Sequence, residues 1–249
     1  MRVIPVIDIS QGQVVHAVAG EREHYRPVCS RLCPDSDPAA IVQAFLDLHS
    51  FDTVYMADLD AITGRKPNDA CLQRLLNKFP HLNFWLDRGI DCKAEMLKAM
   101  HPRIQHVIGS ETGFSPKLLP ELLVLSPQPI LSLDFREGNL LGNQALLQQP
   151  GFWPDNIIFI NLDRVGTTRG VDEGLLAHIL QITGHSHVFI GGGIRDMSDM
   201  HHLQALGITG ILVATALHMG QITSAELKAM AHTNEKKMPR KTGHYHSNG

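Results

Sequence analysis

Short apolar segments that alternate with longer segments of helical periodicity constrain the fold of this chain more than any other feature. Several of the short segments are apolar without interruption, as is typical of parallel strands that are covered on both faces. We predict eight strands at residues 3–9, 53–58, 83–87, 105–109, 130–134, 156–163, 187–191 and 210–214. Helical patterns fill the gaps between them at residues 39–48, 68–78, 93–100 and 175–181.

Eight strands with intervening helices in 249 residues predict an α/β fold, a closed (β/α)8 barrel of the TIM type. We expect a single barrel domain over residues 1–233. The remaining residues, 234–249, read NEKKMPRKTGHYHSNG and show no hydrophobic periodicity. We therefore predict that they form a polar, disordered tail.

An internal offset indicates that the barrel consists of two related halves. Asp58 and Asp163 end the second and sixth predicted strands and lie 105 residues apart. Asp8 and Asp134 end the first and fifth strands, but they lie 126 residues apart, so the first half carries an insertion at about residues 11–38. Because this insertion follows the first strand, we expect it at the barrel mouth, either as a substrate lid or as a solvated surface loop.

Composition excludes several classes of partner and compartment. The chain has 22 Lys plus Arg against 25 Asp plus Glu, which gives no basic footprint for nucleic acid or for a membrane surface. No apolar run is long enough to span a bilayer and no signal peptide is evident, so we expect a cytoplasmic protein. The four cysteines follow no framework spacing, and Cys29 and Cys33 near His24 are better explained as loop residues than as metal ligands. We therefore predict no metal site.

Aspartates that end apolar strands are the first candidates for catalysis. Loops at the carboxyl ends of the strands form the active face of such barrels, so Asp8 and Asp134 should face each other across the mouth. Two carboxylates can divide the roles of acid and base if their environments separate their pKa values. A strand-end Asp can equally cap a loop or pair with Arg, and we favour such structural roles for Asp58 and Asp163.

Small residues after the last two strands predict a phosphate site. Three glycines in FIGGGIRD, among them Gly192 and Gly193, leave backbone N–H groups open to an anion. Ala214 and Thr215 follow the eighth strand and allow the next helix to approach the same anion. Loops in these two places often bind phosphate in this fold.

The corresponding loops of the first half predict a weaker anion site. Gly109 and Ser110 follow the fourth strand, and Arg88 follows the third. Asp87 and Glu111 would repel a phosphate in this place unless their charges are offset. The two halves are therefore expected to be electrostatically unequal.

Taken together, the motifs IPVIDIS with GQVVHAV, VYMADLDAITGRKPN, HVIGSET, SLDFREG, the GT of RVGTTRG, GGGIRD and ILVATAL identify a family resemblance. Over about residues 1–219 the chain resembles the histidine-pathway (HisA) isomerase that acts on phosphoribosylformimino-5-aminoimidazole carboxamide ribotide and, less closely, the imidazole glycerol phosphate synthase cyclase. The resemblance implies a sugar-phosphate isomerase working by an Amadori rearrangement without metal or organic cofactor. It implies Asp134 as general acid at the ring oxygen and Asp8 as general base at C2. It also implies a phosphate held by Gly192, Gly193, Ala214 and Thr215.

The chain departs from the pattern of this family at several positions. The glycine triplet and following Arg of the first half are replaced by Asp87, Arg88, Gly89, Ile90 and Asp91. His16 stands at the family's usual basic position, and Val165 stands where the family has Asp before Gly166. A substrate with two phosphates therefore fits poorly. The weaker candidates for substrate contacts are His16, Asp58, Arg88, Asp163 and Thr167.

Three functional hypotheses follow. The first is a diverged HisA-like enzyme that isomerises a phosphorylated sugar or related small phosphometabolite with Asp8 and Asp134, of the kind found beside one-carbon cofactor genes. The second is the genuine isomerase of histidine biosynthesis. The third is a catalytically silent barrel that binds a phosphorylated ligand or a partner protein, because fold alone does not decide function.

Overall fold

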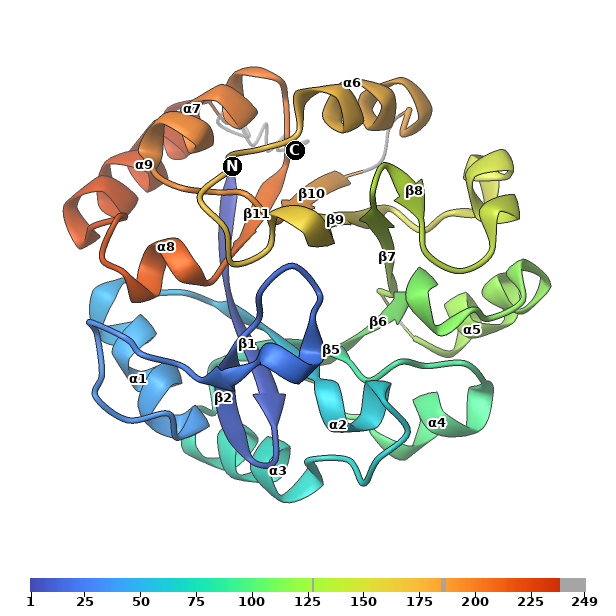
Figure 1. Ribbon diagram of the computed structural model, residues 1–249, viewed down its shortest axis with the longest axis horizontal. Coiled ribbons are helices and arrows are strands. Elements are labelled where there is room, and N and C mark those ends of the chain that lie inside the picture. The colour runs from blue at the N-terminus through green and yellow to red at the C-terminus, as the bar shows by residue number, and fades with distance from the viewer. Residues whose placement is uncertain (127, 185–186, 238–249) are drawn as a thin grey trace, which may run out of the picture.

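The computed structural model describes residues 1–126, 128–184 and 187–237. Eight parallel strands form a ring at its centre (Figure 1). In chain order they are β1 (Arg2–Ser10), β4 (Thr53–Asp58), β5 (Asn83–Asp87), β6 (Ile104–Gly109), β7 (Ile130–Arg136), β9 (Asn156–Asn161), β10 (His187–Gly191) and β11 (Gly210–Val213). Strand β11 pairs in parallel with β1, where Gly210 lies opposite Arg2, and this pairing closes the sheet. The predicted (β/α)8 barrel is therefore confirmed.

Helices surround the ring of strands (Figure 1). The longer ones are α1 (Pro38–Leu48), α3 (Asp69–Lys78), α4 (Lys93–Lys98), α5 (Leu119–Leu125), α6 (Glu173–Ile182), α7 (Met197–Ala205) and α9 (Ser224–Lys237). Helix α1 begins at Pro38 because the preceding residue, Asp37, is a good N-cap. The Asp37 side chain accepts hydrogen bonds from Ala39 N and Ala40 N, and Pro38 is favoured in the first turn of a helix. No helix in the described ranges is long and apolar enough to cross a bilayer.

Most predicted strands and helices begin or end within one or two residues of those in the structure, and the differences at β9 and at the start of the tail are informative. Strand β9 ends at Asn161 rather than at residue 163, because the Asn161 side chain accepts a hydrogen bond from Asp163 N and starts the 3-10 turn η6 (Leu162–Arg164). Helix α9 continues to Lys237, so the predicted polar tail begins inside a helix. Residues 238–249, the rest of that tail, lie outside the described residues.

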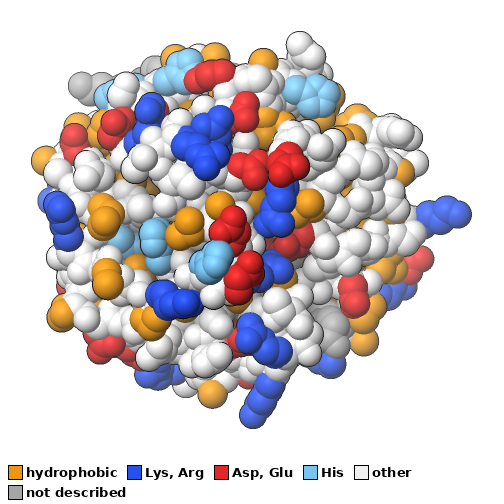
Figure 2. All heavy atoms as spheres, viewed as in Figure 1, with side chains coloured by type: hydrophobic (Ala, Val, Ile, Leu, Met, Phe, Trp, Pro, Cys, Tyr) orange, Lys and Arg blue, Asp and Glu red, His pale blue; other side chains and the backbone are white. Residues whose placement is uncertain are grey.

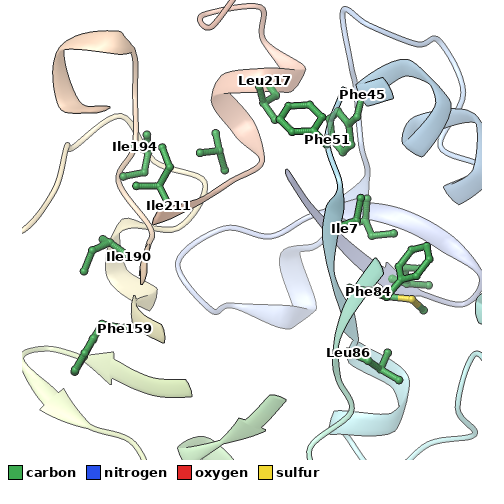
Figure 3. Close-up of a cluster of buried hydrophobic side chains, with 14 of the residues drawn as sticks. Ile7, Phe45, Phe51, Phe84, Leu86, Phe159, Ile190, Ile194, Ile211 and Leu217 are labelled. Carbon is green, nitrogen blue, oxygen red and sulfur yellow. The ribbon is translucent and has the colours of Figure 1, made fainter. Parts of the chain in front are cut away.

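Strand alternation divides the buried side chains into two layers. One layer lies between strands and helices and includes Ile7, Phe45 and Phe84 (Figure 3). The other fills the barrel, where the rings of Trp85 and Phe189 pack edge to face with their centroids 4.8 Å apart. Successive side chains on a strand face opposite sides of the sheet. Asp87, two positions after Trp85 on β5, therefore also faces inward, at the carboxyl end of the barrel.

The two halves share local features beyond their strands. The first strand of each half continues into an antiparallel hairpin, β1 with β2 (Gln13–His16) and β7 with β8 (Asn139–Leu140). Short helical turns follow the second and fourth strands of each half. These turns are α2 (Leu59–Ile62) and η2 (Ser110–Thr112) in the first half, and η6 and α8 (Thr215–His218) in the second.

The insertion at residues 11–38 covers the barrel mouth. It contains β2, η1 (Arg22–His24) and β3 (Arg26–Pro27), and part of its dark blue trace runs over the ring of strands in Figure 1. It is attached to the opposite half by Ala19 N, which donates to the carbonyl of Val165 at 2.9 Å. A second attachment joins Arg31 N to the carbonyl of His218 at 2.7 Å. The insertion therefore forms a cover over the mouth.

Candidate active site

A cavity of about 230 Å³ lies under this cover at the carboxyl ends of the strands. Acidic, basic and His side chains gather over the middle of this face in Figure 2. The polar side chains and glycines that line the cavity include Asp8, His16, Arg22, Tyr25, Tyr55, Asp87, Glu111, Asp134, Arg136, Gly192, Gly193 and Thr215. The cavity thus collects residues from both halves and from the insertion.

The structure brings Asp8 and Asp134 into this one cavity. Asp134 is 5% exposed and accepts a hydrogen bond from the Ser132 hydroxyl at 2.9 Å. Burial, with the negative charges of Glu111 and Asp87, raises the pKa of Asp134 to about 7. Burial and the charge of Asp87 raise the pKa of Asp8 to about 7, and Arg22 opposes this shift. Both carboxyl groups can therefore exchange protons near neutral pH.

Asp87 is a third buried carboxyl in the cavity, although it was not proposed as a catalytic residue. It accepts hydrogen bonds from the Tyr55 hydroxyl at 2.9 Å and from Gly89 N at 3.0 Å. Gly109 lies between it and Asp134, because a Cβ atom placed on Gly109 would stand 3.6 Å from an oxygen of each carboxylate. Burial and the charge of Glu111 raise the pKa of Asp87 to about 6.

We predict that Asp87→Asn makes the protein more stable at alkaline pH. A carboxyl whose pKa is higher in the folded state holds its proton there after the unfolded chain has lost it, so stability falls as pH rises from about 4 to about 6. Removing the charge should raise the free energy of unfolding by about 2 kcal/mol at about pH 8 and much less at about pH 4. Urea unfolding at the two pH values measures the difference, with the exposed Glu137→Gln as control. An equal effect at both pH values would contradict the assignment.

The predicted phosphate residues form an open cradle of backbone donors. In the described part of the chain, the N–H groups of Gly192, Gly193 and Thr215 donate to no protein acceptor. Both glycines have positive φ, and a Cβ on either would stand within 2.4 Å of a carbonyl oxygen, so any other residue would force the loop to move. Ala214 lines the cavity between β11 and α8.

Two histidines lie beside this cradle. His16 Nε2 lies 3.4 Å from the Thr215 hydroxyl, and burial lowers the pKa of His16. His218 is buried in the cavity wall with Nδ1 3.0 Å from the Ser30 hydroxyl, and burial lowers its pKa to about 4. His16 thus occupies a position from which a ring nitrogen can reach an anion held by the cradle. His218 was not expected from the sequence.

Other predicted site residues have structural partners instead. Asp58 is fully buried and accepts hydrogen bonds from the backbone and side-chain nitrogens of Asn68 at 2.8 and 2.7 Å. Arg88 pairs with Asp58 at 3.2 Å and with Asp69 at 2.7 Å, and its side chain does not line the cavity. Asp163 accepts a hydrogen bond from Glu137 N. These contacts agree with the structural role predicted for Asp58. Arg88, in contrast, is not placed to bind substrate in the cavity.

At the anion site predicted in the first half, groups of the protein take the positions that an anion would need. Ser110 is fully buried, and its hydroxyl accepts a hydrogen bond from Asp134 N at 3.0 Å. Gly109 faces the carboxylates of Asp87 and Asp134 rather than open space. Thr167 does line the cavity, and its hydroxyl donates to the carbonyl of Arg164 at 2.9 Å.

Two arginines of the cavity wall were not among the candidate site residues. Arg22, in the cover, pairs with Glu111 at 2.7 Å. Arg136 stands on β7 two residues after Asp134, and a Cβ on Gly20 would clash with its guanidinium. The alternation of β7 was the available signal for Arg136, because residues two apart face the same side. Among the described residues no cluster of three His, Cys, Asp or Glu could hold a metal ion.

The closed ring of strands and the polar cavity define a (β/α)8 barrel with its candidate active site at the carboxyl ends of the strands. Residues 2–151 and 153–223 match the family model described as Histidine biosynthesis protein. The chain therefore belongs to this histidine biosynthesis family.

Individual relatives cover nearly the whole chain. An uncharacterized protein of Methanocaldococcus jannaschii is 31% identical over 91% of this chain and 97% of its own length. A Thermus thermophilus protein is 25% identical over 91% of this chain and 98% of its own. It is named 1-(5-phosphoribosyl)-5-((5-phosphoribosylamino)methylideneamino) imidazole-4-carboxamide isomerase. A Deinococcus radiodurans protein of the same name is 28% identical over 89% of this chain and 95% of its own.

Proposed function

We propose that this protein is an acid–base isomerase of aldose–ketose type that acts on a phosphorylated sugar or a related small metabolite. One observation carries the proposal: Asp8 and Asp134, each with a pKa raised to about 7, line the same cavity as the open cradle at Gly192, Gly193 and Thr215. The isomerase names of relatives in the family support the reaction class.

The proposed reaction is a rearrangement of an aldosylamine. Protonated Asp134 gives its proton to the ring oxygen as the bond from C1 to that oxygen breaks, which leaves an iminium group at C1. Asp8 then removes the proton from C2, and the electron pair forms an enolamine that neutralises the iminium. Finally Asp8 returns a proton to C1 while the C2 hydroxyl proton passes to Asp134, which gives the aminoketose and restores both carboxyl groups.

The phosphate of the substrate anchors it beside the two carboxyl groups in this proposal. Backbone N–H groups at Gly192, Gly193 and Thr215 supply hydrogen bonds to the anion without a compensating loss of protein hydrogen bonds. His16 would add a further donor on the cover side of the cradle. The cover lies over the cavity and would limit the access of water to the reacting atoms, which strengthens the interactions of charged groups there.

We predict a bell-shaped dependence of kcat/KM on pH with a maximum near pH 7. As pH falls below about 7 the base Asp8 becomes protonated, and as pH rises above about 7 the acid Asp134 loses its proton. Steady-state rates on an accepted substrate across the pH range measure the profile. A rate independent of pH through this range would contradict the assignment of both groups.

Turnover assays on the histidine-pathway aminoaldose and on singly phosphorylated aldosylamines test the proposal, with Asp8→Asn beside the wild type. Turnover of the histidine-pathway compound, with growth of a histidine auxotroph restored, would favour the genuine histidine isomerase. Normal phosphate affinity with no turnover on any compound would favour a silent binding barrel.

A role in one-carbon cofactor synthesis rests on the sequence resemblance alone. The four free cysteines support a reducing, cytoplasmic location.

A further inference from the structure

The loops after the third strand of each half differ in whether a backbone N–H group is open to an anion. In the second half, Gly191 ends β10 and the N–H of Gly193 donates to no acceptor in the described part of the chain. In the first half, 104 residues earlier, Asp87 stands in place of Gly191 and Gly89 in place of Gly193. The N–H of Gly89 donates to Asp87 Oδ1 at 3.0 Å. The donor that is open in one half is thus occupied by a carboxylate of the protein in the other.

The loops after the fourth strand repeat this contrast. Thr215 lines the cavity with its N–H open, whereas the equivalent Ser110 is fully buried and its hydroxyl is bonded to Asp134 N. The Glu111 backbone contributes a hydrogen bond that lowers the pKa of Asp134. The side chain of Glu111 adds a further carboxylate at this end of the cavity, paired with Arg22.

We propose that Asp87 is an internal substitute for a second phosphate. Its carboxylate takes the place of an anion on the Gly89 N–H and makes the cavity specific for substrates with one phosphate, whose opposite end carries hydroxyl or amino donors. This inference rests on the phosphate cradle of the proposed function. On this inference the chain differs in substrate class from the relatives whose name contains two phosphoribosyl groups.

Charge explains why a second phosphate is excluded. Burial and the charge of Glu111 raise the pKa of Asp87 only to about 6, so its carboxylate is ionised at about pH 8. A phosphate on Gly89 N–H would have to displace this carboxylate and then lie beside it, where like charges in a buried site repel strongly. Hydroxyl or amino groups meet no such repulsion, because the free lone pairs of Asp87 and Glu111 can accept their hydrogen bonds.

The test measures binding rather than turnover. Isothermal titration calorimetry at about pH 8 gives the number of inorganic phosphate ions bound per chain, and the affinities for a hexose monophosphate and the corresponding bisphosphate. The variants are Asp87→Gly, which recreates the loop of the second half, and Asp87→Asn, which keeps the shape of the side chain and removes its charge. Glu137→Gln, an exposed carboxylate outside the cavity, controls for the change in net charge.

The wild type and the control should bind one phosphate per chain, and neither should prefer the bisphosphate. Asp87→Gly should bind two, with affinity for the bisphosphate raised about tenfold or more. Asp87→Asn should shift the preference in the same direction, which keeps the test valid if the glycine variant folds poorly. Two phosphates on the wild type, none at all, or an unchanged preference in both Asp87 variants would overturn the inference. One bound phosphate without turnover would overturn only the proposed activity.

Discussion

Replacing Asp8 or Asp134 with Asn should lower kcat by about 10³-fold while leaving phosphate binding unchanged, because general acid–base groups contribute about 10²- to 10⁴-fold. Asn keeps the size of each side chain but neither accepts nor gives a proton in the required range. The phosphate cradle follows β10 and β11, and neither Asp8 nor Asp134 contributes a donor to it. Steady-state kinetics on an accepted substrate, with calorimetry using inorganic phosphate, separate the two effects.

Glu137→Gln is the matched control for these variants, since it removes one carboxylate near the end of β7 without altering the cavity lining. Its kcat should stay close to that of the wild type. The assignment of the acid–base pair fails if either Asn variant keeps a kcat within about threefold of the wild type. A parallel loss of phosphate binding would instead indicate damage to the whole cavity.

Gly193→Ala should weaken phosphate binding by about 10- to 100-fold, the effect expected for the loss of hydrogen bonds to a charged group. A Cβ at this position would stand 2.3 Å from the carbonyl oxygen of Gly170, and φ is +88°. The loop must therefore move and carry its N–H away from the anion. The strain should also lower the free energy of unfolding by about 1–3 kcal/mol.

Gly151→Ala provides the comparison for this substitution. Gly151 has open space around its Cβ position and lies outside the cavity, so the same change there should alter neither phosphate affinity nor stability appreciably. Calorimetry with inorganic phosphate and urea unfolding measure both quantities. A Gly193→Ala protein with wild-type phosphate affinity would remove this loop from the binding site.

Periodicity was sufficient to predict the barrel and the place of Asp8 and Asp134. Continuous apolar runs set the strands, and the carboxyl ends of parallel strands meet on one face, so polar residues that end two such strands gather there. The offset between halves also located the insertion at residues 11–38. These features depend on local sequence pattern, which is why the sequence alone revealed them.

Long-range contacts were the part that the sequence did not reveal. Arg88 was expected near the substrate, but Asp58 and Asp69, which lie on different elements, hold it away from the cavity. The insertion could be a lid or a surface loop until its contacts with Val165 and His218, both in the other half, were known. Such pairings depend on the packed three-dimensional arrangement rather than on local spacing.

Asp87 illustrates the same limit within the candidate site. The sequence indicated that a glycine triplet was missing, but not that the replacing carboxylate would bond the Gly89 N–H and the Tyr55 hydroxyl. Alternation on β5 places Asp87 on the same side as Trp85, which packs inside the barrel. That alternation was the available signal for a third carboxyl in the cavity.

Proton exchange at C2 is the most direct test of the central claim that this cavity performs acid–base isomerisation. The wild type is incubated in deuterium oxide with a panel of singly phosphorylated aldoses and aldosylamines, and proton NMR follows the C2 hydrogen. We predict deuterium incorporation into at least one compound, abolished by Asp8→Asn and retained by Glu137→Gln. Exchange that persists in Asp8→Asn, or no exchange in any compound by folded wild-type protein that binds phosphate, would contradict the account.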